Sequence, residues 1–444
     1  MSFKELNLSN QLLKALDELG LTEPTTIQQR AFAPIMAGRD VLGIAQTGTG
    51  KTYAYLLPLM RLWKYSKAML PEILILVPTR ELVIQVLEET NKLGKYSNIL
   101  AVGAYGGGNI NVQMAEVHKG ANIVVATPGR LLDLILKGTI NPKLIKKLVI
   151  DEVDEMLNLG FRTQINNILD LLPERRQNLM FSATMTDEVQ KLLSGYNFNN
   201  PEKIEAAPTG TPLANITQIG YKVPNFYTKV NFLVHLLETD KSMTKVLIFA
   251  GSKKLADAIN ELMELKFPDQ LAVIHSNKAQ NQRFKTVREF ESGENSILIA
   301  TDIIARGLDV SGVSHVINMD VPNVPENYMH RIGRTGRADK KGISITFISD
   351  FDKENKLKVE ELMGRKIAMK KMPEEVEIST VLISEEQPKV HEPFVEKVKI
   401  KKVEKGASFH EKKDKNKKVN QKITREDQKK KKYGRRYKKE HRKD

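Results

Sequence analysis

Residues 41–52 read Val-Leu-Gly-Ile-Ala-Gln-Thr-Gly-Thr-Gly-Lys-Thr, a short apolar run followed by a glycine-rich loop and a lysine–threonine pair. An apolar run of this length predicts a buried strand, with a helix after the loop. Gly48 and Gly50 allow backbone N–H groups to close around phosphate oxygens at the positive end of that helix. The stretch predicts an α/β domain with a phosphate-binding loop of Ala45, Gln46, Thr47, Gly48, Thr49, Gly50, Lys51 and Thr52.

Similar β-branched runs alternate with helix-length amphipathic stretches along most of the chain, which is typical of parallel α/β architecture. The runs lack polar alternation, as expected for strands that helices cover on both faces. The expected strands of the first half are Val41–Ala45, Ile73–Val77, Ala101–Tyr105, Ile123–Ala126, Leu148–Ile150 and Leu179–Phe181. The pattern restarts with Val246–Ala250, Ala272–His275, Ile297–Ala300, His315–Met319 and Ile343–Ile348.

The prolines and glycine at residues 206–213 indicate a linker between two α/β domains. After Pro373 the periodicity fades, and from Lys397 lysine dominates with few large apolar residues. Such a composition does not bury enough surface to offset chain entropy. We therefore expect domains at 1–205 and 214–372, and a disordered basic tail at 373–444.

The whole net charge lies near the carboxyl terminus. Residues 1–396 hold 47 basic and 47 acidic side chains, whereas the last 48 residues hold 22 and 7. A basic tail of this kind attracts an acidic polymer, because each neutralised phosphate releases a counterion. The tail is therefore expected to bind an acidic polymer such as a nucleic acid; the alternative is a solvated segment that aids solubility.

Other features of the composition restrict the class of protein. The 444 residues include no cysteine, so disulfides and thiolate metal sites are excluded. The apolar runs are strand-sized and too short to span a bilayer. The residues after Met1 are polar and do not form a signal-peptide core. These observations predict a cytoplasmic location.

Two motifs together predict a nucleoside triphosphatase. Lys51 would neutralise β- and γ-phosphates, and the Thr52 hydroxyl would ligate Mg²⁺. Asp151 and Glu152 follow the expected strand at 148–150, where Asp151 would hold the metal and Glu152 would orient or deprotonate the attacking water. Taken singly, the loop could be a glycine-rich turn and the acidic cluster a solvated helix start.

The sequence resembles the DEAD-box family of ATP-dependent RNA helicases over about residues 3–370. The box itself reads Asp151-Glu152-Val153-Asp154, with valine in place of the family's alanine. Other motifs follow in the family's order: Pro24–Gln28, Pro78–Leu82, Gly106-Gly107, Thr127–Arg130, Ser182-Ala183-Thr184, Gln280 with Arg283, Ala300–Asp302, Arg306–Asp309 and His330–Arg337.

The resemblance implies two recombinase-like domains with ATP and Mg²⁺ in the cleft between them. Gln28 and Phe3 would read adenine, with Leu21 where the family often has a stacking aromatic residue. Asp309 would contact the ribose. Arg334 and Arg337 would act as arginine fingers from the second domain, which contribute roughly 10³ to 10⁵ in rate.

The resemblance also implies that RNA lies across both domains with little sequence specificity. The expected RNA-binding residues are Arg80, Gly107, Thr127, Gly129, Arg130, Arg283 and Thr301. Asp154, Ser182, Thr184 and His330 would couple hydrolysis to closure. The expected activity is local separation of short RNA duplexes. The alternatives are an ATP-gated RNA clamp or annealing chaperone, and a DNA translocase of the same superfamily.

Overall fold

The computed structural model describes residues 2–46, 48–196, 198, 200–206, 215–302, 312–336 and 341–387. Thr47, Asp309, Arg337, the linker after Ala206 and the tail after Gln387 therefore lie outside the described residues. The described part forms two seven-stranded sheets in which every pairing is parallel. This arrangement confirms the expected fold of two tandem α/β domains.

The first sheet has the order β3-β4-β2-β5-β6-β1-β7. Its strands are β1 (Val41–Ile44), β2 (Ile73–Leu76), β3 (Ala101–Ala104), β4 (Ile123–Ala126), β5 (Lys147–Ile150), β6 (Gln177–Ser182) and β7 (Glu202–Glu205). The expected strands β1–β6 are confirmed to within a few residues. β7 was not expected, since it is a short edge strand in which only Ile204 is buried.

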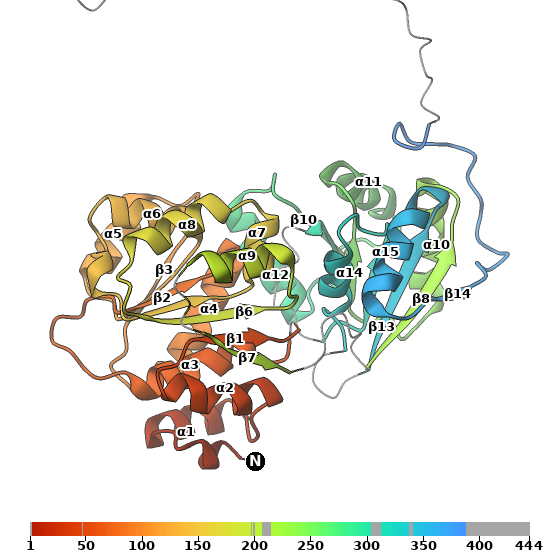
Figure 1. Ribbon diagram of the computed structural model, residues 1–444. Helices are drawn as coiled ribbons and strands as arrows, with labels where there is room; N and C mark the ends of the chain where they lie inside the picture. Colours follow the sequence, from red (N-terminus) through yellow and green to blue (C-terminus); the bar gives the residue numbers. More distant parts are fainter. Residues whose placement is uncertain are drawn as a thin grey trace, which may run out of the picture. The chain divides into compact units, whose positions relative to one another are not determined.

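Alternate side chains of these strands enter two separate cores. Val41, Ile73 and Val149 pack under η1 (Phe3–Leu6), α1 (Asn10–Glu18), α2 (Thr26–Met36), α3 (Lys51–Leu62) and α4 (Arg80–Gly94). Leu42, Leu74 and Leu148 pack on the opposite side, under α5 (Ile110–His118), α6 (Pro128–Leu136), α7 (Val153–Asn158), α8 (Arg162–Leu171) and α9 (Asp187–Gly195). Figure 1 shows α1–α3 below this sheet and α5, α6 and α8 above it.

The second sheet has the order β10-β11-β9-β12-β13-β8-β14. Its strands are β8 (Ile216–Lys222), β9 (Val246–Phe249), β10 (Leu271–Ile274), β11 (Ile297–Ala300), β12 (His315–Asn318), β13 (Gly342–Ile348) and β14 (Ala368–Lys370). Its helices are α10 (Phe226–Thr239), α11 (Lys253–Met263), α12 (Gln280–Ser292), α14 (Pro325–Ile332) and α15 (Lys353–Met363). Short 3₁₀ turns are η2 (Pro142–Leu144) and η3 (Asp350–Asp352).

Residues 373–386, here called the strap, lie against the second domain. Val376 is buried with the α10 side chains, and Asn231 Nδ2 donates to the Glu377 carbonyl at 3.0 Å. Ser379 N donates to Thr228 Oγ1 at 3.0 Å. The packed chain thus continues 14 residues past the expected domain boundary at 372, to Glu386.

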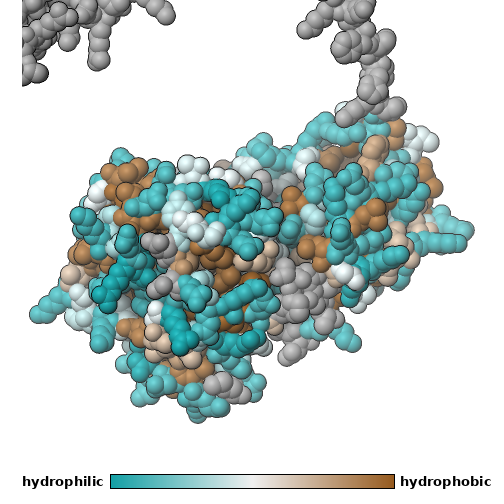
Figure 2. All heavy atoms as spheres, viewed as in Figure 1, coloured by the Kyte–Doolittle hydropathy of each residue, from teal (hydrophilic) through white to brown (hydrophobic). Residues whose placement is uncertain are grey.

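The surface of the described chain carries no membrane-spanning element. Within the described ranges no helix is both long and apolar enough to cross a bilayer. Figure 2 shows the face in view as a mosaic of hydrophilic and hydrophobic residues.

Candidate active site and RNA interface

The strand order divides the motifs of the first domain into two groups. The carboxyl ends of the neighbouring strands β5, β6 and β1 lead into the acidic box, the Ser-Ala-Thr motif and the phosphate loop. The carboxyl ends of β3, β4 and β2 lead into Gly107, Thr127 and Arg80. Because ligands of open parallel sheets bind beyond these ends, the two groups form adjacent sites on one edge.

The phosphate loop ends in a left-handed turn that begins α3. Gly48 and Gly50 have φ values of 79° and 86°, a region that favours glycine. Lys51 begins α3 and is only 6% exposed, yet its Nζ atom has no hydrogen-bond partner among the described residues. A buried ammonium without an acceptor is costly, so this position fits an anionic ligand such as a phosphate.

Gln28 connects the segment before α2 to the phosphate loop. Its Nε2 donates to the Gly50 carbonyl at 3.1 Å, and its Oε1 accepts from Thr25 N at 3.0 Å. A Cβ at Gly50 would overlap the Gln28 amide, so glycine is required there by space as well as by φ. One N–H and one lone pair of the Gln28 amide remain for a base edge.

The two other residues expected near adenine differ in their surroundings. Phe3 is 4% exposed and packs in the core beneath α1 and α2. Leu21 is 36% exposed. The role of Phe3 in nucleotide binding therefore stays a prediction. In the structure, the buried Phe3 side chain holds the amino-terminal segment against the first domain.

The donor set at Asp151 and Thr52 consists of oxygens, which suits Mg²⁺. Asp151 is 3% exposed and accepts a hydrogen bond from Tyr55 OH at 3.1 Å. Burial raises the pKa of Asp151, and Lys51 and Tyr55 oppose that rise. No group of three or more metal-ligating side chains occurs in the described ranges. Mg²⁺ commonly uses one or two protein oxygens plus water and phosphate, so the residues fit this metal.

Glu152 occupies a strained backbone position. Its φ and ψ are 52° and 49°, left-handed values that cost a non-glycine residue about 1–2 kcal/mol. Burial raises the pKa of Glu152 to about 7, although Lys51 and Arg334 lower it. Such strain and such a pKa are concentrated at functional sites, and a carboxylate of this kind suits a general base near neutral pH.

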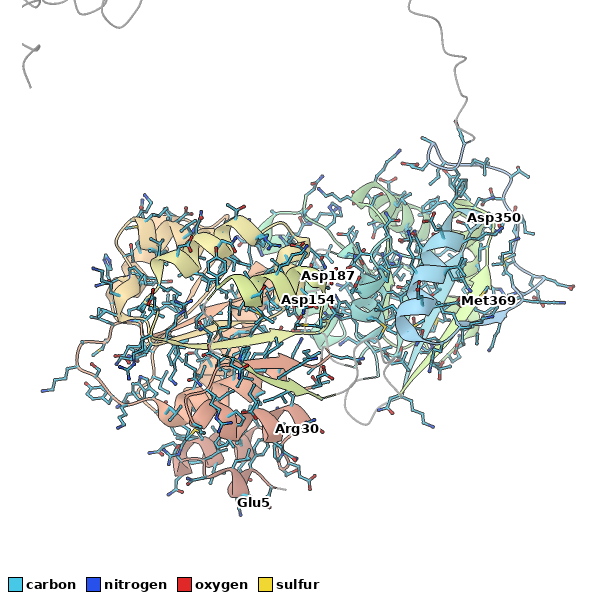
Figure 3. All side chains as sticks on the ribbon, viewed as in Figure 1. Glu5, Arg30, Asp154, Asp187, Asp350 and Met369 are labelled. Carbon is cyan, nitrogen blue, oxygen red and sulfur yellow. The ribbon has the colours of Figure 1, made fainter. Side chains whose placement is uncertain are left out.

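Asp154, which is labelled in Figure 3, lies at the start of α7. It contacts the Ser-Ala-Thr motif. Both the backbone N and the Oγ1 of Thr184 donate to Asp154 Oδ2, at 2.9 and 2.7 Å. Ser182 Oγ in turn donates to the Thr184 carbonyl at 2.7 Å. His330 Nδ1 lies 3.8 Å from Glu155 Oε2. The four residues expected to couple the domains are therefore close together.

The arginines of α14 and the turn after it have different partners. Arg334 is 4% exposed, and its Nε donates to the His330 carbonyl at 3.2 Å. Its charge lowers the pKa of Glu152. Arg331 instead makes two bonds to Asp302, at 2.5 and 2.8 Å, and one to the Asp320 carbonyl at 2.9 Å.

Arg331 and its carboxylate partners form a buried ion-pair network that the sequence did not predict. Burial lowers the pKa of Arg331, but Asp320 and Asp302 together hold it above its usual range. The network ties α14 to the loop after β11, where Thr301 also lies. One sequence feature could have indicated this network: a basic residue in a buried helix turn needs an acidic partner.

The residues of the first domain that are expected to bind RNA are held in place by other parts of the protein. The Arg80 guanidinium lies over Gly107, where any Cβ would overlap it. Arg130 is 9% exposed, with Nη1 donating to Gln113 Oε1 at 2.6 Å and Nη2 to the Gly108 carbonyl at 3.1 Å. Thr127 precedes α6, and the space around Gly129 is open enough for a ligand to approach its backbone.

Arg283 forms a buried ion pair with the first domain. Its Nη2 lies 2.5 Å from Glu81 Oε1, and its Nη1 donates to Gln280 Oε1 at 3.0 Å. Gln280 Oε1 also accepts from Arg80 Nη1 at 3.1 Å. Arg283 thus joins the two domains here, and its contact with RNA stays a prediction. The role of Glu81 was not anticipated from its motif.

Comparison with known proteins agrees with this arrangement. Residues 25–192 match the DEAD/DEAH box helicase family, and residues 228–339 match the helicase conserved C-terminal domain. The chain is 38% identical over 372 residues to the DEAD-box ATP-dependent RNA helicase RhpA of Helicobacter pylori, covering 84% of this chain and 74% of that protein.

Solved structures with the same architecture include two complexes. Saccharomyces cerevisiae Dbp5 bound to RNA and ADP BeF₃ is 30% identical, with a TM-score of 0.75 over 84% of this chain and 95% of that one. Mss116p bound to single-stranded RNA and AMP-PNP is 29% identical, with a TM-score of 0.77 over 84% and 78%. The chain belongs to the family of DEAD-box ATP-dependent RNA helicases.

Proposed function

We propose that the chain binds RNA across both domains, closes on ATP, separates short duplexes locally and releases RNA after hydrolysis. The observation that carries the proposal is the buried Lys51 ammonium, which has no hydrogen-bond partner among the described residues and lies beside an acidic pair whose glutamate has a pKa of about 7. The two similar structures that hold RNA together with a nucleotide analogue support it.

Each residue has one proposed task in hydrolysis. Lys51 binds phosphate oxygens, and the Thr52 hydroxyl and Asp151 carboxylate would hold Mg²⁺, whose chemistry is to neutralise charge on the phosphates. Glu152 takes a proton from the attacking water. Arg334 stabilises charge that develops on the transferred phosphoryl group, together with Arg337. Gln28 provides the preference for adenine, and Asp309 contacts the ribose. Phe3 supports the segment that contains Gln28.

Closure and RNA binding are proposed to depend on each other. Arg80, Arg130 and Arg283, with backbone groups near Gly107, Gly129 and Thr301, bind phosphates and 2′-hydroxyls. The contacts of Asp154 with Thr184, and of Glu81 with Arg283, form part of the closed arrangement. Removing the γ-phosphate weakens closure and frees the RNA.

A strand-displacement assay tests the proposal against the alternatives. A short RNA duplex with a single-stranded extension is incubated with ATP, with a non-hydrolysable analogue, or without nucleotide. Displacement that requires nucleotide supports a helicase. ATP-dependent retention or annealing without displacement would indicate a clamp or chaperone. Equal displacement of the matching DNA duplex would indicate a DNA translocase.

A further inference from the structure

The amino-terminal edge of the first sheet contains a polar hollow that the ATP and RNA motifs do not use. Its volume is about 850 Å³, and its charged lining residues are Arg39, Asp40, Lys146, Arg175, Arg176 and Glu202. These residues lie where β1, β5, β6 and β7 begin. The phosphate loop follows the opposite end of β1, so the hollow is on the other edge of the sheet.

The lining has four basic and two acidic side chains, and both acids already have partners. Glu202 Oε2 pairs with Arg39 Nη1 at 2.9 Å. Asp40 accepts from the backbone N and the Nδ2 of Asn178, at 2.7 and 3.1 Å. Among the basic groups, Lys146 Nζ pairs with Glu72 Oε1 at 2.6 Å, outside the lining. With Glu72 included, the four basic and three acidic side chains still leave one positive charge in excess, over a hydrogen-bonded floor.

Arg175 and Arg176 contribute the guanidinium groups without an acidic partner. Arg175 is exposed, and neither side chain forms an ion pair with a described residue. Arg176 is half-buried, with Nε donating to Asn178 Oδ1 at 2.8 Å and Nη1 to the Pro173 carbonyl at 2.7 Å. Its Nη2 donors remain, since a guanidinium has five N–H groups. Burial lowers the pKa of Arg176, and Asp40 offsets this only in part.

The chemistry of the lining selects among anionic partners. Protein partners are generally anchored by large apolar side chains, and Pro201 is the only apolar side chain in the lining. The lining therefore does not favour a protein partner. A single-stranded base or a free nucleotide would need a surface to stack on, and no aromatic ring lines the hollow. Duplex RNA is recognised mainly through its phosphates and 2′-hydroxyls, which need donors of this kind.

We propose that this hollow binds the sugar–phosphate backbone of an RNA duplex, as a second RNA site outside the helicase motifs. The site lies on the edge opposite the nucleotide, so it holds a double-stranded region while the motifs engage another part of the same RNA. It goes beyond the proposed ATP-driven cycle, because the two sites share no residues.

The double variant Lys146→Ala with Arg175→Ala tests the proposal in the full chain. Both side chains are exposed, and the variant breaks only the surface ion pair of Lys146 with Glu72, so the fold should persist. We expect affinity for a long RNA duplex to fall about three- to tenfold at low salt, and the slope of log affinity against log salt to decrease by about one to two. Affinity for a short single strand, and the ATPase rate that it stimulates, should not change.

Lys64→Ala with Lys137→Ala is the matched control, because it removes the same charge from exposed positions of the same domain outside the hollow. Duplex affinity and salt slope equal to those of the control would overturn the proposal. So would loss of inorganic tripolyphosphate binding without loss of duplex binding, since the hollow would then serve a small anion. A different outcome would contradict the proposed function instead: no ATPase activity stimulated by a short single-stranded RNA in any of the proteins, including the unmutated chain.

Discussion

Thr184 donates two hydrogen bonds to a single carboxylate oxygen of Asp154, one from its backbone N at 2.9 Å and one from Oγ1 at 2.7 Å. Burial alone would raise the pKa of Asp154. His330, Lys51 and the neighbouring hydroxyls hold it below its usual range instead. The charged Asp154 carboxylate is therefore where the acidic box, the Ser-Ala-Thr motif and the second domain influence one another.

Replacing Thr184 with valine should separate hydrolysis from strand separation. The variant keeps the backbone donor and loses the hydroxyl, and one hydrogen bond to a charged group contributes about 1.5–3 kcal/mol. We expect duplex displacement per ATP hydrolysed to fall about tenfold or more, while the ATPase rate changes about threefold or less. Thr184→Ser, which retains the hydroxyl, is the control. Parallel loss of both activities would remove the coupling role.

Replacing Glu152 with glutamine should abolish turnover without abolishing binding. Glutamine has nearly the same shape but does not accept a proton from water, and positioned general bases contribute roughly 10²- to 10⁴-fold. We expect ATP and RNA affinities near those of the unmutated chain, with hydrolysis lower by at least about a hundredfold. Nucleotide titration and steady-state ATPase assays on one preparation give both values. Near-normal hydrolysis would exclude Glu152 as the base.

The pH dependence follows from the raised pKa of Glu152, which is about 7. The base acts when deprotonated, so kcat/KM for ATP should rise with pH through about 7. The folded state keeps a proton that the unfolded state releases above about pH 4.5, so this group contributes less stability as pH rises from 4.5 to 7. Glu152→Gln should therefore raise Tm near pH 8 but hardly near pH 5. A constant Tm difference would indicate an ordinary Glu152 pKa.

Gln28 is predicted to affect both base choice and the phosphate loop. Gln28→Ala removes the amide that contacts Gly50, as well as the groups proposed to read adenine. We expect the preference for ATP over GTP to decrease, and the affinity for both nucleotides to fall by a further few-fold. The measurement is KM for each nucleotide at saturating RNA. If the unmutated chain hydrolyses GTP as well as ATP, the adenine-reading assignment is wrong.

Most of the fold could be predicted because its strands are continuous apolar runs. The three strands that were missed lack such runs. β8 alternates buried and exposed residues, β7 has one buried side chain, and every residue of β14 is exposed. Each of these strands forms because the neighbouring strand offers unpaired backbone N–H and C=O groups. Those groups are available only once the sheet has folded, so the local sequence does not reveal them.

The site was predictable where chemistry is carried by one contiguous motif, as in the phosphate loop and the acidic box. It was not predictable where a motif residue bonds to a distant partner. The RNA contact of Arg283 stays a prediction, and the motif gave no sign that its guanidinium also lies against Glu81, about 200 positions earlier in the chain. The arginine of a motif does not by itself indicate whether a phosphate or a carboxylate will face it, because both suit its donors.

The strap determines where the basic tail can be removed safely. Asn225 Nδ2 donates to the Ser379 carbonyl at 2.7 Å, and Phe226 N donates to Glu386 Oε1 at 2.7 Å. Truncation after residue 372 removes these bonds and exposes the apolar surface around α10, so Tm should fall by several degrees. Truncation after residue 396 retains the strap and should leave Tm unchanged. Equal Tm values would mean that the strap contributes little stability.

Truncation after residue 396 also tests the tail as an RNA tether, because it removes all of the net charge. The catalytic motifs remain, so the maximal ATPase rate should be nearly unchanged. The RNA concentration for half-maximal rate should rise at low salt, because fewer counterions are released on binding. The same loss should decrease the slope of log affinity against log salt, for structured and single-stranded RNA alike. If the two slopes coincide, the tail contributes solubility and does not hold RNA.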